Sequence, residues 1–227
     1  MYSLRLALFD IAGTTLLDNN LVDNAFMRVF QRLDLPARVE ELLPFRGSAK
    51  RPIAEAMVQR YRPEGGEKMI DEIIEGFEAG LIAELRASAR SIPGTEETFG
   101  WLRDHGLKAG LTTGFSRRIG AVVTEVLGWD EALVDVMVCS DEVPESRPAP
   151  WMIYEAMRRA NVYPAAAVLT AGDTPRDLGA GTNAGCGAVV GVLSGSGTVE
   201  TLGRVRHTHL LESVAEIPEL IDREYRA

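Results

Sequence analysis

The stretch "LALFDIAGTTLL", Leu6–Leu17, decides the fold. Four consecutive apolar residues run into Asp10, and a Gly-Thr turn follows at Gly13. A short, continuous apolar run that ends in a polar turn is typical of a strand buried on both faces of a parallel sheet. Ala12 stands two residues after Asp10, so a methyl group accompanies the carboxylate at the end of this strand.

Further apolar runs of the same character follow, and helical patterns such as "SRRIGAVVTEVLGW" stand between them. This alternation indicates an α/β fold, a Rossmann-like doubly wound parallel sheet. The predicted strands cover Leu4–Phe9, Lys108–Thr112, Val134–Cys139, Ala167–Ala171 and Gly187–Leu193.

Residues 16–90 break the alternation, because they contain helical stripes and no convincing strand. A structureless loop of this length is improbable, so we expect a helical cap domain inserted after the first strand. The core domain would then consist of residues 1–15 and 91–227. The return hinge "SIPGTEE" spans Ser91–Glu97, and Thr95 is predicted to cap the following helix.

The composition argues against several classes of partner. The 227 residues include 33 acidic and 24 basic side chains, a net charge of −9, and no run of Lys or Arg exceeds two. We therefore expect binding neither to nucleic acid nor to an anionic membrane surface. No apolar run approaches the roughly 20 residues of a membrane helix. Cys139 and Cys186 lack metal-type or redox-type spacing, which favours buried thiols and a cytoplasmic protein.

Polar residues follow the predicted strands at their carboxyl ends, where open α/β sheets bind ligands. The first strand delivers Asp10, the second Thr113, and the third leads to Arg147. The fourth delivers Asp173 and Asp177. Three carboxylates at one site would repel each other unless a cation joined them, and hard oxygen ligands suit Mg²⁺.

The remaining groups favour a bound phosphoryl group. The turn Gly13–Thr15 is predicted to offer backbone N–H groups as an anion nest, while Thr113 offers a hydroxyl and Arg147 a fixed positive charge. With the metal and the phosphate accounted for, Asp10 is left as an in-line nucleophile that forms an aspartyl-phosphate.

These motifs resemble the haloacid dehalogenase-like superfamily over essentially the whole chain. That family has a nucleophilic Asp in a D-x-D-G-T turn, here "DIAGTT", and a G-D-x-x-x-D turn, here "GDTPRD". It also has a Ser or Thr ending the second strand and a Lys or Arg before the third helix. The resemblance implies a Mg²⁺-dependent hydrolase of small phosphorylated or phosphonate substrates, and it suggests a homodimer. It implies metal ligands at Asp10, Ala12, Asp173 and Asp177.

Ala12 narrows the resemblance, because most phosphatases of the family carry a second Asp there as general acid. The branch of the family that has Ala at this position is that of the phosphonoacetaldehyde hydrolases. The stretches "TTGFSR" and "GDTPRDLGAGTNAG" of this sequence also resemble that branch. This branch implies cleavage of a carbon–phosphorus bond through an imine on a cap lysine. Lys50, three residues after Gly47, stands where that lysine stands.

The local sequence is compatible with an imine-forming lysine. Pro52 suits the first turn of a helix, so Lys50 would lie at the positive end of the helix dipole and beside Arg51. Both effects disfavour the ammonium form of Lys50. Alternatively, Lys50 is a solvated lysine or a cation that steers phosphate. The residues expected to bind substrate or phosphate are Gly13, Thr14, Thr113, Gly114, Arg46 and Lys50.

Two departures from the branch leave alternatives open. Arg46 replaces a methionine and could bind a second anionic group, and Ile53 replaces a histidine that would shuttle protons. A second enzyme hypothesis is a phosphomonoesterase that works without the second Asp. A hypothesis from another class is a non-catalytic protein that binds a phosphorylated metabolite. The loop "GVLSGSGTVE", Gly191–Glu200, either closes the site near the metal or links two elements.

Overall fold

Six parallel strands form one sheet within residues 3–226, the part of the chain that the computed structural model describes. The strands lie in the order β3-β2-β1-β4-β5-β6. They are β1 Leu6–Phe9, β2 Lys108–Thr113, β3 Val136–Cys139, β4 Val168–Gly172, β5 Ala188–Val192 and β6 His209–Leu211. The doubly wound α/β prediction is confirmed, with strand ends shifted by at most two residues and β6 added at the edge.

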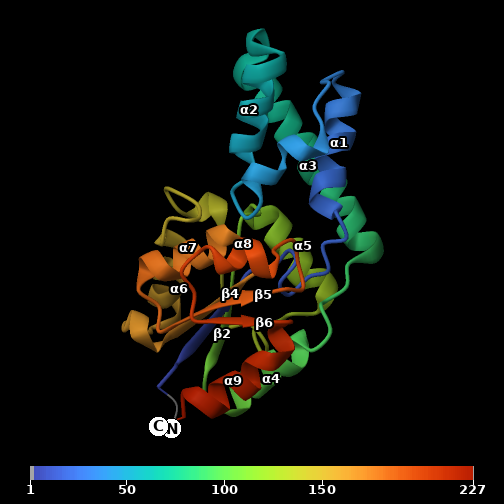
Figure 1. Cartoon of the computed structure of the whole chain (residues 1–227). Helices are drawn as coiled ribbons and strands as arrows, with labels where there is room; N and C mark the ends of the chain where they lie inside the picture. Colours follow the sequence, from blue (N-terminus) through green and yellow to red (C-terminus); the bar gives the residue numbers. More distant parts are fainter. Residues whose placement is uncertain (1–2, 227) are drawn as a thin grey trace.

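Helices cover both faces of this sheet (Figure 1). Successive side chains of β1 point to opposite faces of the sheet, as in any β-strand. Ala7 and Phe9 belong to the apolar cluster that includes α4, α5 and α9, whereas Leu6 and Leu8 belong to the cluster with α6 and α7. The core helices are α4 Thr95–Asp104, α5 Arg117–Leu127, α6 Trp151–Ala160, α7 Pro175–Ala184, α8 Val199–Gly203 and α9 Ile217–Glu224.

Strand β1 lies at the point where the winding direction reverses. It pairs with β2 on one side and with β4 on the other. The chain runs from β1 through β2 to β3 at one edge, then crosses to β4 and continues to β6 at the other edge. Ligands in open α/β sheets bind in the crevice at such a switch point, outside the carboxyl ends of the strands. Asp10, the residue after β1, therefore occupies the centre of this crevice.

Residues 16–90 carry helices that stand above the carboxyl edge of the sheet (Figure 1). They are α1 Leu21–Arg32, α2 Arg51–Tyr61 and α3 Gly66–Ser88. Helix α3 packs against α1 and α2, and the rings of Phe26 and Phe77 stack at 4.1 Å. The outgoing and returning chains meet where Leu17 N donates to Arg90 O. These observations support the division we propose, a core of 1–15 with 91–227 and a cap of 16–90.

The hinge that returns from the cap corrects one prediction. Thr95 does not cap α4, because Gly94 holds the N-cap position with a φ of 88° and Thr95 is the first helical residue. The Thr95 side chain is buried and donates to Thr15 O instead. None of the described helices is both long and apolar enough to cross a membrane.

Two glycines bring the cap loop 46–50 into contact with the core. A Cβ on Gly47 would lie 2.3 Å from Thr174 Oγ1, and a Cβ on Gly114 would lie 2.4 Å from Ser48 O. Gly47 also has a φ of 77°, which a side chain would strain. The cap loop therefore approaches the sheet edge more closely than residues with side chains would allow.

We predict that Gly114→Ala weakens the docking of the cap on the core. Overpacking costs about 1–3 kcal/mol, so the undocked population should rise on the order of tenfold. Limited trypsin digestion measures this change as faster cleavage in the loop that contains Arg46 and Lys50. Gly100→Ala is the matched control, because a Cβ there would meet only the Arg103 side chain, at 3.9 Å. Equal digestion rates for both variants would contradict the prediction.

Candidate active site

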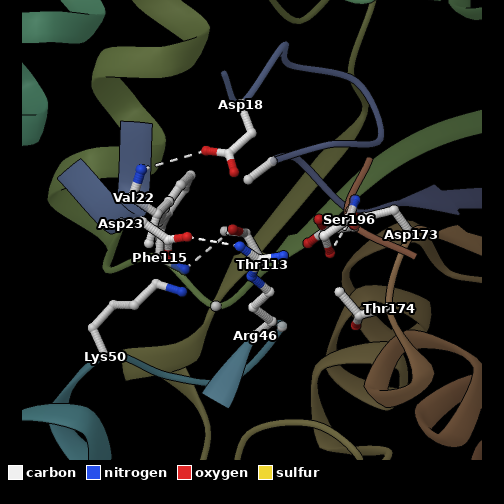
Figure 2. Close-up of a pocket in the computed structure, with 14 residues that line it drawn as sticks. Asp18, Val22, Asp23, Arg46, Lys50, Thr113, Phe115, Asp173, Thr174 and Ser196 are labelled. Atoms are coloured by element: carbon white, nitrogen blue, oxygen red, sulfur yellow. Dashed lines mark hydrogen bonds and ion pairs between the residues drawn. The ribbon is translucent and has the colours of Figure 1, made fainter. Parts of the chain in front are cut away.

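A small cavity lies between the sheet edge and the cap and encloses about 50 Å³ (Figure 2). The core contributes Asp10, Ala12, Thr113, Gly114, Phe115, Asp173, Thr174 and Ser196. The cap contributes Asp18, Val22, Asp23, Arg46, Gly47 and Lys50. The structure thus brings together predicted residues from three strand ends and from the cap. Gly13, Thr14, Arg147 and Asp177 lie behind this lining.

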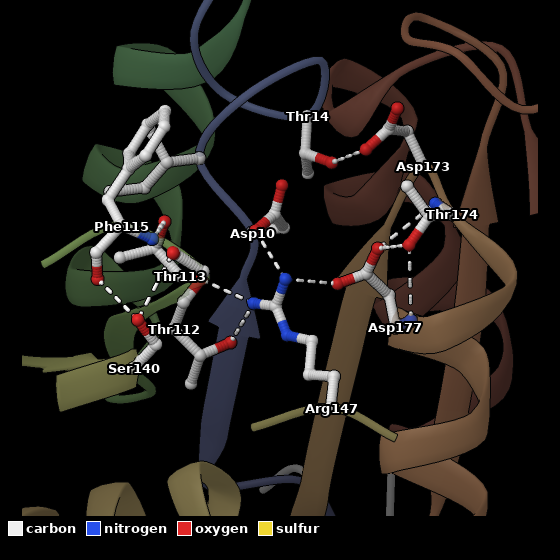
Figure 3. A network of polar contacts seen from close by, with 12 residues as sticks. Asp10, Thr14, Thr112, Thr113, Phe115, Ser140, Arg147, Asp173, Thr174 and Asp177 are labelled. Carbon is white, nitrogen blue, oxygen red and sulfur yellow. Dashed lines mark hydrogen bonds and ion pairs between the residues drawn. The ribbon is translucent and has the colours of Figure 1, made fainter. Parts of the chain in front are cut away.

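Arg147 lies at the centre of the polar network below the cavity (Figure 3). Its Nη1 is 2.6 Å from Asp10 Oδ1 and 2.6 Å from Asp177 Oδ1, and its Nη2 donates to the backbone and side-chain oxygens of Thr112. Burial alone would lower the pKa of Arg147, but the carboxylates of Asp177 and Asp10 raise it. The guanidinium therefore fixes the Asp10 carboxylate at the end of β1.

Asp173 is held from two sides. Its Oδ1 accepts a long hydrogen bond from Thr14 Oγ1, and its Oδ2 accepts bonds from Ser196 N and Oγ at 2.6 and 2.9 Å. A Cβ on Gly195 would lie 2.1 Å from Asp173 Oδ2, so only glycine lets this loop come so close. Ser196 of the loop "GVLSGSGTVE" lines the cavity, which supports the prediction that the loop closes the site, while the loop also links β5 to the following helix α8.

Three buried carboxylates form a group that could hold a metal ion. Oxygens of Asp10, Asp173 and Asp177 lie within 4.8 Å of one another. Burial raises the pKa of Asp173 to about 7 and that of Asp177 to about 6, and the negative charge of Asp10 adds to both shifts. Carboxylates that repel each other in a buried site fit a hard divalent cation, whose charge would reverse these shifts.

Asp177 differs from the other two carboxylates in what it contacts. Its Oδ2 accepts from Thr174 N and Oγ1 at the start of α7, and its Oδ1 pairs with Arg147. Asp10 and Asp173 line the cavity, whereas Asp177 does not. This geometry favours Asp177 as the residue that positions Arg147, and it leaves Asp10 and Asp173 as the two carboxylates of this group that face the cavity, with Ala12 also in the lining.

The predicted anion nest at residues 13–15 is wrong. Gly13 N donates to Leu16 O, and the N–H groups of Thr14 and Thr15 both donate to Ile11 O. The turn closes on itself, so these donors are already used. At the neighbouring strand end, Thr113 Oγ1 accepts from Phe115 N, while Thr113 and Gly114 both line the cavity.

Lys50 reaches the cavity from the N-cap position of α2, with Pro52 in the first turn as predicted. Its Nζ donates to Ser48 O at 3.1 Å and lies 5.5 Å from the centre of the Phe115 ring. The pKa of Lys50 is lowered, mainly by burial and further by Arg147, although Asp10 and Asp18 oppose the shift. The direction agrees with the sequence prediction, but burial is the main cause.

Arg46 and Asp23 form an ion pair on the cap side of the cavity. Arg46 Nη2 donates to Asp23 Oδ2 at 2.7 Å, and the Asp23 side chain is 9% exposed. The role of Arg46 toward a second anionic group stays a prediction, and its charge is already partly compensated. Ile53 stands where the resemblance implies a histidine that shuttles protons, and its side chain is buried in the apolar core.

The sequence reasoning missed Asp18 and Asp23, which belong to the cap side of the cavity. Both lie at the start of the cap: Asp18 precedes α1, and Asp23 stands in its first turn, among the apolar residues that indicate this helix. Val22 is one of these apolar residues, and its neighbour Asp23 is buried. The signal that could have identified Asp23 is an acidic residue on the apolar face of the expected helix, three residues before Phe26 and seven before Phe30.

We predict that the metal-free protein loses stability as the pH rises from about 5 to about 8. The folded-state pKa values of Asp173 and Asp177 lie above the ordinary value of 3.8. The folded protein therefore retains protons that the unfolded chain has released, and this stabilisation disappears as the pH passes the folded-state pKa values. Thermal unfolding in the presence of a chelator measures the effect.

The same experiment with added Mg²⁺ provides the control. The increase in melting temperature should be larger at pH 8 than at pH 5.5, because protons compete with the cation. Asp173→Asn should abolish most of this increase, whereas Asp34→Asn, at an exposed cap position, should retain it. A metal-free melting temperature that rises over this pH range would contradict the prediction.

Known proteins share this sequence and fold. Residues 7–191 match the family described as haloacid dehalogenase-like hydrolase. The chain is 32% identical over 200 residues to phosphonoacetaldehyde hydrolase from Bacillus cereus, covering 83% of this chain and 75% of the relative. It is 29% identical over 207 residues to phosphonoacetaldehyde hydrolase from Paraburkholderia phytofirmans, covering 86% and 78%.

Solved structures agree with the fold. A phosphonoacetaldehyde hydrolase-like protein from Oleispira antarctica superposes with a TM-score of 0.84 at 20% identity, covering 97% of this chain and 92% of that one. A hydrolase from Pseudomonas syringae superposes with a TM-score of 0.82 at 18% identity, covering 98% and 100%. The chain belongs to the haloacid dehalogenase-like hydrolases and is an enzyme of that family.

Proposed function

We propose that this enzyme is a Mg²⁺-dependent hydrolase that cleaves the carbon–phosphorus bond of a phosphonoacetaldehyde-type substrate. The observation that carries the proposal is the placement of Lys50 Nζ in the same cavity as Asp10. The similarity to phosphonoacetaldehyde hydrolases and the alanine at position 12 support the same reaction. The substrate would be small, in keeping with the volume of the cavity.

In the proposed reaction, Lys50 first forms an imine with the substrate aldehyde. Burial favours the neutral amine, which is the nucleophilic form. An Asp10 oxygen then bonds to phosphorus as the carbon–phosphorus bond breaks, and the electron pair of that bond passes into an enamine. Water hydrolyses the aspartyl-phosphate to phosphate, and it hydrolyses the re-protonated imine to release the aldehyde.

The other residues have roles that follow from their contacts. Arg147 holds the Asp10 carboxylate in one orientation, while Asp177 and Thr112 hold Arg147. Thr113 and Gly114 would bind phosphoryl oxygens at the end of β2. A Mg²⁺ ion on Asp10, Asp173 and the main chain of Ala12 would supply positive charge that reduces repulsion between the nucleophile and the phosphoryl group.

We predict that Asp10→Asn abolishes turnover of every accepted substrate, because the amide cannot accept the phosphoryl group. The expected loss exceeds about 10⁴-fold in kcat, as for removal of a nucleophile that works as part of a unit. Phosphate release from phosphonoacetaldehyde and from a panel of phosphate esters measures it. Wild-type rates in this variant would contradict the nucleophile assignment.

The same panel decides between bond types in the unmodified enzyme. Phosphate release from phosphonoacetaldehyde supports carbon–phosphorus cleavage. Strong activity on one phosphate ester and none on the phosphonate would instead favour a phosphomonoesterase. The Arg46–Asp23 pair beside the cavity and the apolar Ile53 are the observations that keep this second function in the comparison.

We predict that borohydride traps an imine on Lys50 when phosphonoacetaldehyde is present. Reduction should leave a two-carbon adduct on this residue after loss of phosphate, and peptide mass spectrometry would locate it. Lys50→Arg should remove both the adduct and phosphonate turnover. Lys68→Arg is the matched control, because Lys68 is an exposed cap lysine on α3. No adduct at saturating substrate would overturn the imine.

A further inference from the structure

Imine formation on Lys50, on which this inference rests, requires a group that moves protons. The ammonium must lose a proton before the amine attacks the aldehyde. The hydroxyl of the resulting carbinolamine must then gain a proton to leave as water. One carboxyl group beside the cavity can do both, since it ends each cycle in the form in which it began.

Most titratable groups at the cavity are engaged elsewhere. Asp10 pairs with Arg147, and Asp23 pairs with Arg46. Asp173 accepts hydrogen bonds from Ser196 and belongs to the carboxylate group that fits a metal. His105, His207 and His209 all lie in the described part of the chain, and none of them lines the cavity.

Asp18 is the remaining carboxyl group of the cavity lining. Within residues 3–226 it takes part in no ion pair, and the hydrogen bond to its Oδ1 is a long one of 3.4 Å from Val22 N. Figure 2 shows its carboxylate and the Lys50 amine directed toward the interior from different parts of the cap. A substrate that fills so small a cavity would contact both groups.

Asp18 also has access to water on its other side. A second, polar cavity of about 360 Å³ borders the first, and Asp18 and Arg46 line both of them. The next two residues, Asn19 and Asn20, have φ values of 40° and 61°, a conformation that costs free energy in residues other than glycine. The chain therefore turns sharply after Asp18, which stays in the wall between the two cavities.

We propose that Asp18 is the acid–base residue for imine formation on Lys50. A water molecule in the cavity would relay a proton from the Lys50 ammonium to the Asp18 carboxylate, because the two groups form no ion pair within the described residues. This transfer leaves a neutral amine and a carboxylic acid. The amine adds to the aldehyde, giving a carbinolamine. The carboxylic acid returns the proton to the carbinolamine hydroxyl, the carbon–oxygen bond breaks, and water leaves. The products are the protonated imine and the Asp18 carboxylate, so protons and charge balance.

The surroundings of the cavity bring the pKa values of Asp18 and Lys50 closer together. Burial raises the pKa of Asp18 above its usual value, and Asp23 raises it further, while the hydrogen bond from Val22 N and the charges of Lys50 and Arg46 oppose the shift. Burial lowers the pKa of Lys50. The free energy of moving a proton from the ammonium to the carboxylate is therefore smaller in this cavity than in water.

Asp18→Asn tests the proposal, because the amide oxygen can still accept from Val22 N but the side chain can no longer exchange a proton. Two rates are measured in the full-length enzyme: borohydride-trapped labelling of Lys50 by phosphonoacetaldehyde, and phosphate release from p-nitrophenyl phosphate. We expect the first to fall about 10²-fold or more. The second needs no imine and reports on the nucleophile alone, so the proposal predicts a much larger loss of labelling than of this phosphatase rate.

Two further variants separate chemistry from structure. Asp34→Asn is the same substitution at an exposed cap position away from the cavity, and it should keep both rates. In Asp18→Ala, added formate should restore part of the labelling rate, since a small carboxylic acid can occupy the vacated space. Structural damage would not respond to formate.

The outcomes distinguish this proposal from the proposed function. Absence of Lys50 labelling in the unmodified enzyme overturns the imine itself, and the role of Asp18 with it. Normal labelling in both the unmodified enzyme and Asp18→Asn leaves the imine standing and overturns the role of Asp18. Selective loss of labelling in Asp18→Asn, with formate rescue of Asp18→Ala, supports the proposal.

Discussion

One guanidinium group at the sheet edge compensates two carboxylates that would otherwise repel each other. Arg147 contacts Asp10 and Asp177 within a buried network, and breaking such a network leaves an uncompensated charge at a cost of about 3–5 kcal/mol. Asp173 adds a third buried carboxylate nearby. The site therefore has two negative charges more than Arg147 can compensate, which is the electrostatic condition that favours a divalent cation.

The same constraint explains why the crevice lies where it does. Arg147 reaches Asp10 at β1, Thr112 at β2 and Asp177 at the start of α7, so it links three elements on both sides of the winding reversal. A shift of any one element would stretch a charged hydrogen bond. This edge is thus held by charged contacts from three elements, and the cap loop that docks through Gly47 and Gly114 completes the cavity from the opposite side.

The fold and the polar residues at the strand ends could be predicted from the sequence. The pattern of apolar residues determines the fold, and the place of a residue after a strand determines where it lies. Continuous apolar runs identified the strands, and parallel strands bring their carboxyl ends together whatever the loop geometry. The anion nest at Gly13–Thr15 could not be judged, since the closure of that turn on Ile11 and Leu16 depends on backbone angles. Asp18 and the pairing of Asp23 with Arg46 depend on how the cap folds over the core, which spacing along the chain does not encode.

Ala12 explains in chemical terms why the core and the cap would supply different reacting groups. A core that carries its own general acid at this position can protonate a leaving group whether or not the cap contributes. In the proposed reaction of this enzyme, Lys50 and Asp18 both belong to the cap, while the nucleophile belongs to the core. Chemistry then requires the docked cap, and docking also excludes bulk water from a cavity in which a neutral amine must persist. The absence of one carboxylate from the core thus makes closure of the cap a condition for reaction.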